Sequence, residues 1–202
     1  WPVVAELVLW VNDAQREIAL LKPDAAAVND TITLIAGTKQ AIPTGGNRLL
    51  KVVRNMSAAS NGTGKRAVRL VDREVLDAQT PDWHDPTVAG DAAHAAVVKH
   101  YIYDESNPRN FYVYPGVSGT AYLEIIYSSN PAAVAQGGDL SIPDIFANAV
   151  LNYVLYMAYM KDAEYAGNQQ RASSHFQLFT ASVTGKGQID AITNPNMERR
   201  AP

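Results

Sequence analysis

Residues 61–66 are a first cluster whose residue types and spacing suggest chemistry. They read Asn-Gly-Thr-Gly-Lys-Arg, and glycines before a lysine are typical of phosphate-binding loops, in which backbone N–H groups surround phosphate and a Ser or Thr holds magnesium. Here Ala59 occupies the place of the first glycine, and Arg66 occupies the place of the Ser or Thr. The glycines therefore predict a hairpin turn and no nucleotide site.

Three histidines could in principle ligate a metal ion together with nearby aspartates. His84, His94 and His100 follow one another at intervals of ten and six residues. Histidine ligands on one rigid element usually lie one helical turn apart, so these intervals place the side chains on different elements. We therefore expect no metal site and no cofactor. A small hydrolase or metal-dependent enzyme that uses residues 84–100 is the alternative function.

The remaining reactive side chains lack the partners that catalysis needs. Ser128 and Ser173 each begin a pair of serines, and His175 follows the second pair, but no Gly-x-Ser-x-Gly turn accompanies either pair. The charged run 161–164 is typical of a helix end, where a lysine meets the negative end of the helix dipole. The chain has no cysteine, which excludes thiol nucleophiles and cysteine zinc sites. We predict no catalytic residue and no enzyme.

Length and charge exclude further classes of protein. The chain of 202 residues is 47% hydrophobic and 18% charged, which predicts one compact, folded domain. Its net charge of −3 and sequence pI near 5.8 argue against a DNA-binding protein. The most apolar stretch, residues 145–160, contains Asn148 and Asn152 and is shorter than the roughly 20 residues that span a membrane. We expect no membrane segment.

Apolar residues at steps of three and four predict helices at both ends of the chain. The first helix covers residues 2–22, where Pro23 ends the pattern. The second covers residues 143–165 and is apolar around most of its circumference. The third covers residues 168–184, and residues 185–202 form an extended tail. We expect four residues to be buried between these helices: Val11, Ile18, Leu151 and Leu155.

The middle of the chain, residues 31–127, reads as an antiparallel β region. Polar loops at residues 57–64 and 104–110 separate its β-rich runs. Asp72 is placed to cap a short helix that ends at Gln79, and Trp83 is placed to anchor the long loop that follows. The last β-rich runs, 97–103, 111–114 and 120–127, predict an antiparallel meander.

These elements predict an α+β fold. A bundle of the N-terminal helix and the two C-terminal helices carries the antiparallel β region as an insertion, and all of them belong to one domain over residues 1–184.

Several of these runs together resemble the head-to-tail adaptor proteins of tailed bacteriophages. They are residues 7–18 (LVLWVNDAQREI), 66–74 (RAVRLVDRE), 111–115 (FYVYP) and the helix over 144–165. The order of elements is similar to that of the adaptors up to about Val183, and it is similar in plan to tail tubular protein A of short-tailed phages.

The resemblance implies a structural virion protein of the head-tail connector. Such adaptors form a homo-oligomeric ring, commonly a dodecamer, which assembles in the host bacterial cytoplasm. The ring sits under the portal protein and receives the tail nozzle or other tail proteins. Genomic DNA passes through its channel without specific binding, and no cofactor is implied.

Two sets of residues are the candidate contacts of such an adaptor. Polar loops on a rigid sheet can bind a tail protein or a neighbouring subunit without contributing to the core. The candidates on the loops are Asn61, Lys65, Glu105, Asn107 and Arg109. The tail has too few apolar residues for a core of its own, so we expect it to bind the portal or a neighbouring adaptor. The candidates in the tail are Ile189, Ile192, Met197, Arg199 and Arg200.

Overall fold

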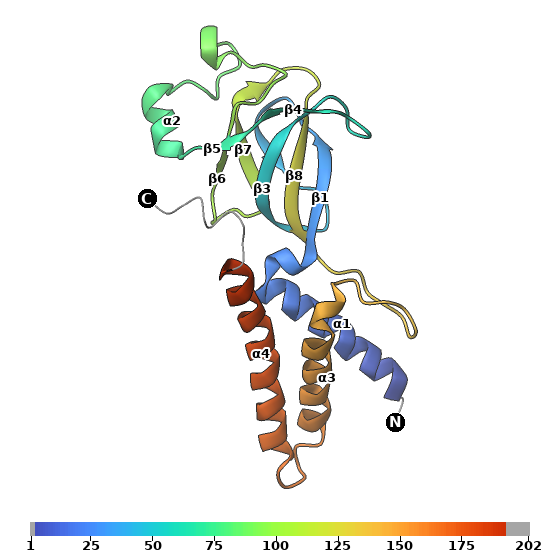
Figure 1. Cartoon of the computed structure of the whole chain (residues 1–202). Coiled ribbons are helices and arrows are strands. Elements are labelled where there is room, and N and C mark those ends of the chain that lie inside the picture. The colour runs from blue at the N-terminus through green and yellow to red at the C-terminus, as the bar shows by residue number, and fades with distance from the viewer. Residues whose placement is uncertain (1–2, 193–202) are drawn as a thin grey trace. The chain divides into compact units, whose positions relative to one another are not determined.

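The structure is a computed structural model that describes residues 3–192, and the chain divides into two compact units. The helical unit comprises residues up to 26 and from 130 onward, and the β unit comprises residues 27–129 (Figure 1). The predicted α+β class is confirmed, because helices and two largely antiparallel sheets coexist. The inserted β region is a compact unit with its own core.

The helical unit packs three helices around one apolar core. They are α1 (Val3–Leu21), α3 (Ala147–Lys161) and α4 (Asn168–Ile192), with short 3-10 helices η1 (Pro23–Ala26) and η3 (Asp144–Phe146). The core contains Ala14, Ile18, Phe146, Ala149, Val150, Phe179 and Val183. The helix predicted over residues 2–22 is confirmed as α1. None of the helices in the described part of the chain has the length and apolar character to cross a membrane.

The third helix is longer than the sequence predicts. It continues through Gly185 and Gly187 to Ile192, so residues 185–192 are helical and not an extended tail. Two ion pairs hold this end: Lys186 Nζ lies 2.6 Å from Asp190 Oδ1, and Lys22 Nζ lies 3.1 Å from Asp190 Oδ2. These contacts compensate for the low helix propensity of glycine. The second helix is shorter than predicted, because it ends at Lys161.

The prediction that Leu151 is buried is wrong. Its side chain is 55% exposed, whereas Ile18 is fully buried. Leu155 and Val11 are half-buried. The cause is that α3 contacts α1 and α4 on two sides and leaves a third, apolar side uncovered.

The β unit is built from two four-stranded sheets that enclose its core. Sheet A has the order β1-β8-β3-β4, and sheet B has the order β2-β7-β6-β5. The strands are β1 (Ala27–Thr33), β2 (Gly37–Ala41), β3 (Gly46–Met56), β4 (Gly64–Ala67), β5 (Arg69–Leu70), β6 (His100–Tyr103), β7 (Asn110–Val117) and β8 (Tyr122–Ser129). Leu49, Val52, Val98, Phe111, Val113, Leu123 and Ile125 lie between the sheets.

The predicted three-stranded meander is wrong in its last strand. Strands β6 and β7 pair antiparallel in sheet B, but β8 pairs with β1 and β3 in sheet A. The chain passes from one sheet to the other between β7 and β8. It also changes sheets at Val68, because β4 pairs with β3 while β5 pairs in parallel with β6.

The short helix α2 (Arg73–Gln79) and the loop after it pack against sheet B. Trp83 is fully buried, and its Nε1 donates a hydrogen bond of 2.7 Å to Asp77 Oδ1, which confirms its predicted role as an anchor. It packs with Leu76 and Tyr114 in a small cluster of its own. The predicted cap is wrong, since the side chain of Asp72 makes no capping hydrogen bond.

Candidate interaction surfaces

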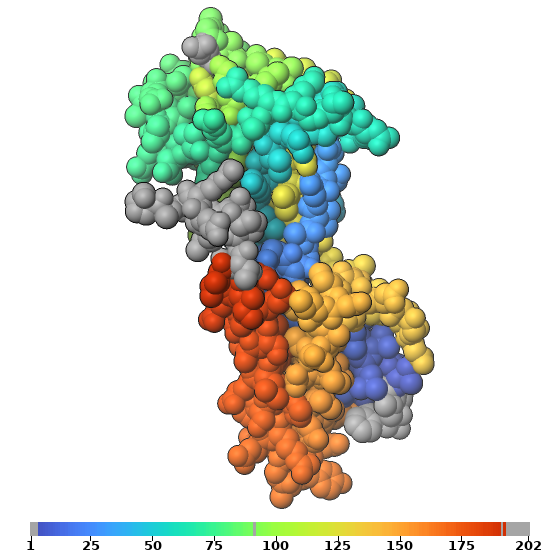
Figure 2. Space-filling model, in the orientation of Figure 1, coloured from blue at the N-terminus to red at the C-terminus, as the bar shows by residue number. Residues whose placement is uncertain are grey.

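The loop of residues 57–63 joins β3 to β4 and forms a closed tip. Ser57 N donates to Thr63 O at 3.0 Å, and Thr63 N donates to Ser57 Oγ at 2.8 Å. Asn61 has a positive φ of 52°, and a Cβ on Gly62 would lie 2.5 Å from Ala58 O. The tip is therefore tightly folded, and it projects from the β unit as the teal lobe of Figure 2. Asn61 is exposed on it, and Lys65 is exposed at the start of β4.

The loop of residues 104–109 joins β6 to β7 and is also fixed by its own hydrogen bonds. Ser106 N donates to Asp104 Oδ1 at 2.8 Å, and this bond holds the pKa of that carboxyl below its usual range. Asn107 and Arg109 line a surface hollow of about 430 Å³ that also includes Ile42. Glu105 is exposed on the same loop.

The structure does not bring these two loops together. Leu49, near the start of β3, donates its backbone N–H to Pro108 O at 2.9 Å, so the loop of residues 104–109 lies beside that end of the strand. The loop of residues 57–63 follows the other end of β3, eleven residues along. Asn61 and Lys65 therefore belong to one surface, and Glu105, Asn107 and Arg109 belong to another.

The candidates in the C-terminal segment are only partly described. Ile189 and Ile192 lie in the last turns of α4, where they are 59% and 78% exposed. Met197, Arg199 and Arg200 lie outside the described residues. The two isoleucines are thus presented by a helix and not by an extended chain.

An apolar groove that the sequence did not predict runs along α1. It has a volume of about 460 Å³, and α1 contributes Val4, Leu7, Val8 and Val11 to it. Residues 134–138 and Leu140 form the opposite wall.

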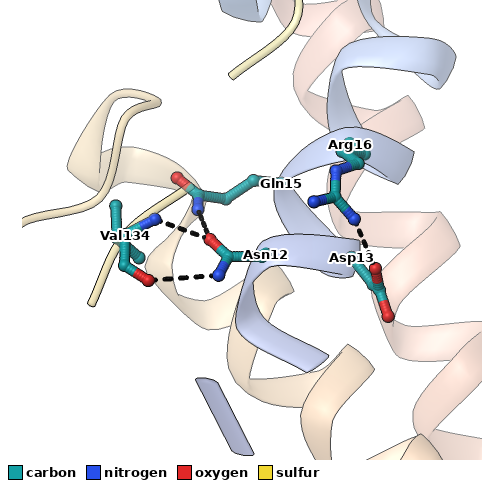
Figure 3. A network of polar contacts seen from close by, with 5 residues as sticks. All are labelled: Asn12, Asp13, Gln15, Arg16 and Val134. Carbon is teal, nitrogen blue, oxygen red and sulfur yellow. Dashed lines mark hydrogen bonds and ion pairs between the residues drawn. The ribbon is translucent and has the colours of Figure 1, made fainter. Parts of the chain in front are cut away.

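Two buried amides on α1 hold that wall in place (Figure 3). Asn12 Nδ2 donates to Val134 O at 3.1 Å, and Val134 N donates to Asn12 Oδ1 at 2.8 Å. Gln15 Nε2 donates to Asn12 Oδ1 at 3.3 Å, and Gln15 Oε1 accepts from Ser141 N at 2.7 Å. The signal in the sequence is the presence of Asn12 and Gln15 within an apolar stretch, since a buried amide needs polar partners from elsewhere in the chain.

The helical unit also exposes many large apolar side chains. On α3 and α4 these are Leu151, Met160, Phe176, Leu178, Ile189 and Ile192. Exposed apolar surface of this kind is typical of protein–protein interfaces.

Two of the three histidines of the alternative function, His84 and His100, pack against aromatic rings. His84 stacks on Trp83 at 3.6 Å between ring centroids, and its Nδ1 lies 2.8 Å from Thr38 Oγ1. Burial and then the charge of Arg73 lower the pKa of His84. Among the described residues, no group of three His, Asp or Glu is placed to share a metal ion. The observed contacts of His84 are structural.

A model of one protein family, described as SU10 adaptor protein, matches residues 1–199 of the chain. The match therefore spans both units. No curated protein matches the chain significantly. The family description does not mention tail tubular protein A, so that likeness stays a prediction.

Proposed function

The chain belongs to the SU10 adaptor protein family, which makes it a structural adaptor protein of a bacteriophage, and we propose that it is a subunit of the ring that joins the portal to the tail. The ring assembles in the cytoplasm of the host bacterium and becomes part of the virion. It continues the channel through which genomic DNA passes without sequence-specific binding. The observation that carries this proposal is the family match over both units.

The helical unit supports the proposal through its exposed apolar surface. A helix such as α3, apolar on three sides, gains stability when a neighbour covers the side that α1 and α4 leave open. A head-to-tail contact between identical subunits closes into a ring when its rotation closes. Leu151, which is 55% exposed, is the α3 residue on which such a contact would bury most new area.

The C-terminal segment provides the contact with the portal or with a neighbouring adaptor. The exposed Ile189 and Ile192 on α4 contribute apolar area. Met197, Arg199 and Arg200 extend the contact with one more apolar anchor and two cations. Each such contact is weak, but repetition around a ring raises the total affinity.

The two loops of the β unit contact tail proteins or a neighbouring subunit. Because they lie at opposite ends of β3, we assign them to different partners or to different subunits. Asn61 and Lys65 serve one contact, and Glu105, Asn107 and Arg109 serve the other. The residues proposed act in binding, and none acts in catalysis.

The experiment that tests this function mixes the purified chain with purified portal and follows co-sedimentation. We expect the full chain to sediment with the portal and a variant truncated after Ile192, which loses Met197, Arg199 and Arg200, to bind the portal more weakly. Lys39→Ala, at an exposed lysine on β2 that none of the proposed contacts includes, serves as the control and should bind the portal normally. Failure of the full chain to bind any portal of the same phage would contradict the proposal.

A further inference from the structure

Three bulges in β3 determine which of its side chains face outward. The pairing of β3 with β8 shifts register three times, so every third residue of β3, and not every second, faces the core. The inward residues are Gly46, Leu49, Val52 and Asn55. Arg48, Lys51 and Arg54 are also three residues apart, and they lie together on the outer face of sheet A.

These cations are only partly neutralised. We define the basic face as Arg48, Lys51 and Arg54 on β3. Arg54 Nε donates to Glu124 Oε2 at 2.5 Å, and this bond lowers the pKa of the Glu124 carboxyl. In the described part of the chain, neither Arg48 nor Lys51 forms an ion pair.

The acidic residues of sheet A do not offset this charge. They are Glu124, which Arg54 and Asn29 already bind, and Asp30 on the edge strand β1. The sequence holds the same signal, since residues 31–71 contain seven Lys or Arg and no Asp or Glu. The basic face is therefore an uncompensated positive surface on a rigid sheet.

The surroundings of the basic face favour phosphate over a protein partner. Thr31 on β1 and Asn47 on β3 add a hydroxyl and an amide to the same sheet, and such groups commonly bind DNA phosphates together with Lys and Arg. Among the described residues, the strongly exposed large apolar side chains lie on other elements, and none lies on β1, β3, β4 or β8. A protein interface usually has an apolar centre, which this face lacks.

We propose that the basic face binds the phosphate backbone of double-stranded DNA and lines the channel of the ring. This inference rests on the proposed function and assigns the surface that meets DNA. Each subunit offers a few cations and no base-reading element, so the contact is independent of sequence and weak enough for DNA to slide.

A salt titration of DNA binding tests the inference. The affinity of the full chain for a short duplex should fall as salt rises, and the slope of log affinity against log salt should weaken by about 0.9 when Lys51→Glu removes one phosphate contact. The control is Lys39→Glu, an exposed lysine on β2 of sheet B, which should leave the slope unchanged. An equal loss in the control would overturn the proposal.

Cross-linking separates this inference from the proposed function. Because the chain has no cysteine, Lys51→Cys and Lys39→Cys can each carry a single thiol-linked photo-crosslinker. In rings assembled on portals with DNA in the channel, Lys51→Cys should cross-link to DNA and Lys39→Cys should not. Rings that form without this cross-link would overturn the inference and leave the adaptor function standing. Cross-links from Lys51→Cys to a protein instead would show that the face is a protein interface and would also overturn it.

Discussion

Asn55 and Val98 are joined by two hydrogen bonds between one side-chain amide and one residue's backbone. Asn55 Nδ2 donates to Val98 O, and Val98 N donates to Asn55 Oδ1, both at 2.8 Å. Asn55 Nδ2 also donates to Arg66 O at 2.9 Å. The buried amide thus connects β3 to Arg66 in β4, two residues before the chain changes sheets at Val68. It also connects β3 to Val98, two residues before β6. Asn12 and Val134 repeat the same arrangement in the helical unit.

Replacing Asn55 should destabilise the β unit strongly. Asn55→Ala leaves buried backbone groups without partners, and we expect a loss of about 3 kcal/mol in the free energy of unfolding. Urea unfolding followed by tyrosine and tryptophan fluorescence measures the loss. Lys51→Ala, on the exposed side of the same strand, should change stability by less than about 0.5 kcal/mol. Equal effects of the two variants on the free energy of unfolding would show that the hydrogen bonds of Asn55 do not stabilise the β unit.

Replacing Asn12 should release the wall of the apolar groove. Asn12→Ala removes both partners of Val134, and we expect a loss of about 2 kcal/mol together with faster hydrogen exchange in residues 131–141. Asn148→Ala, an exposed asparagine on α3, is the control and should leave exchange in that segment unchanged. Unaltered protection of the segment in the Asn12 variant would contradict the role of this contact.

Alanine variants of Leu151 and Phe179 should distinguish the outer surface of the helical unit from its core. Phe179 is 1% exposed, so Phe179→Ala should cost about 3 to 5 kcal/mol. Leu151→Ala should leave the isolated subunit almost as stable as before and should weaken ring formation. Thermal melting and size-exclusion chromatography measure these two effects. A large loss of melting temperature in Leu151→Ala would mean that the exposed side of α3 is part of the core.

The stability of the last turns of α4 should depend on pH through Asp190. Hydrogen bonds from Lys186 and then Lys22 hold the pKa of Asp190 below its usual range. Burial alone would lower the pKa of Lys22, but Asp24 and Asp190 outweigh it and raise the pKa. A carboxyl with a depressed pKa stabilises the fold above its unfolded pKa of about 3.9, and this stability is lost as pH falls through the folded pKa.

Asp190→Asn should therefore speed amide exchange in residues 186–192 at neutral pH. The difference from the unaltered chain should shrink as the pH approaches the folded pKa of Asp190. Glu164→Gln, which changes an exposed carboxyl at the far end of the helix pair, is the control. Identical exchange in all three proteins at neutral pH would rule out this role for the ion pairs.

Local patterns in the sequence predict the helices of this chain better than its sheets. The apolar spacing of α1 and the stop at Pro23 identify that helix almost to the residue. The end of α4 is different, because Gly185 and Gly187 are typical of a helix stop and only the long-range Lys22–Asp190 pair shows why the helix continues. Leu151 is apolar like its buried neighbours, and its exposure depends on where α1 and α4 lie.

Strand pairing and bulges depend on contacts between residues that are far apart in the chain. Strand β2 reads Gly-Thr-Lys-Gln-Ala and has Thr38 as its one β-branched residue, so its position in sheet B follows from pairing with β7. The bulges of β3 put Arg48, Lys51 and Arg54 on one face, whereas a period of two would divide them between both faces. The basic face was therefore not predictable from the alternation of residues.

The most direct test of the adaptor function is electron microscopy of the purified chain mixed with purified portal of the same phage. We expect a closed ring of this chain, coaxial with the portal, whose central channel is continuous with that of the portal. Free monomers beside bare portal rings would contradict it.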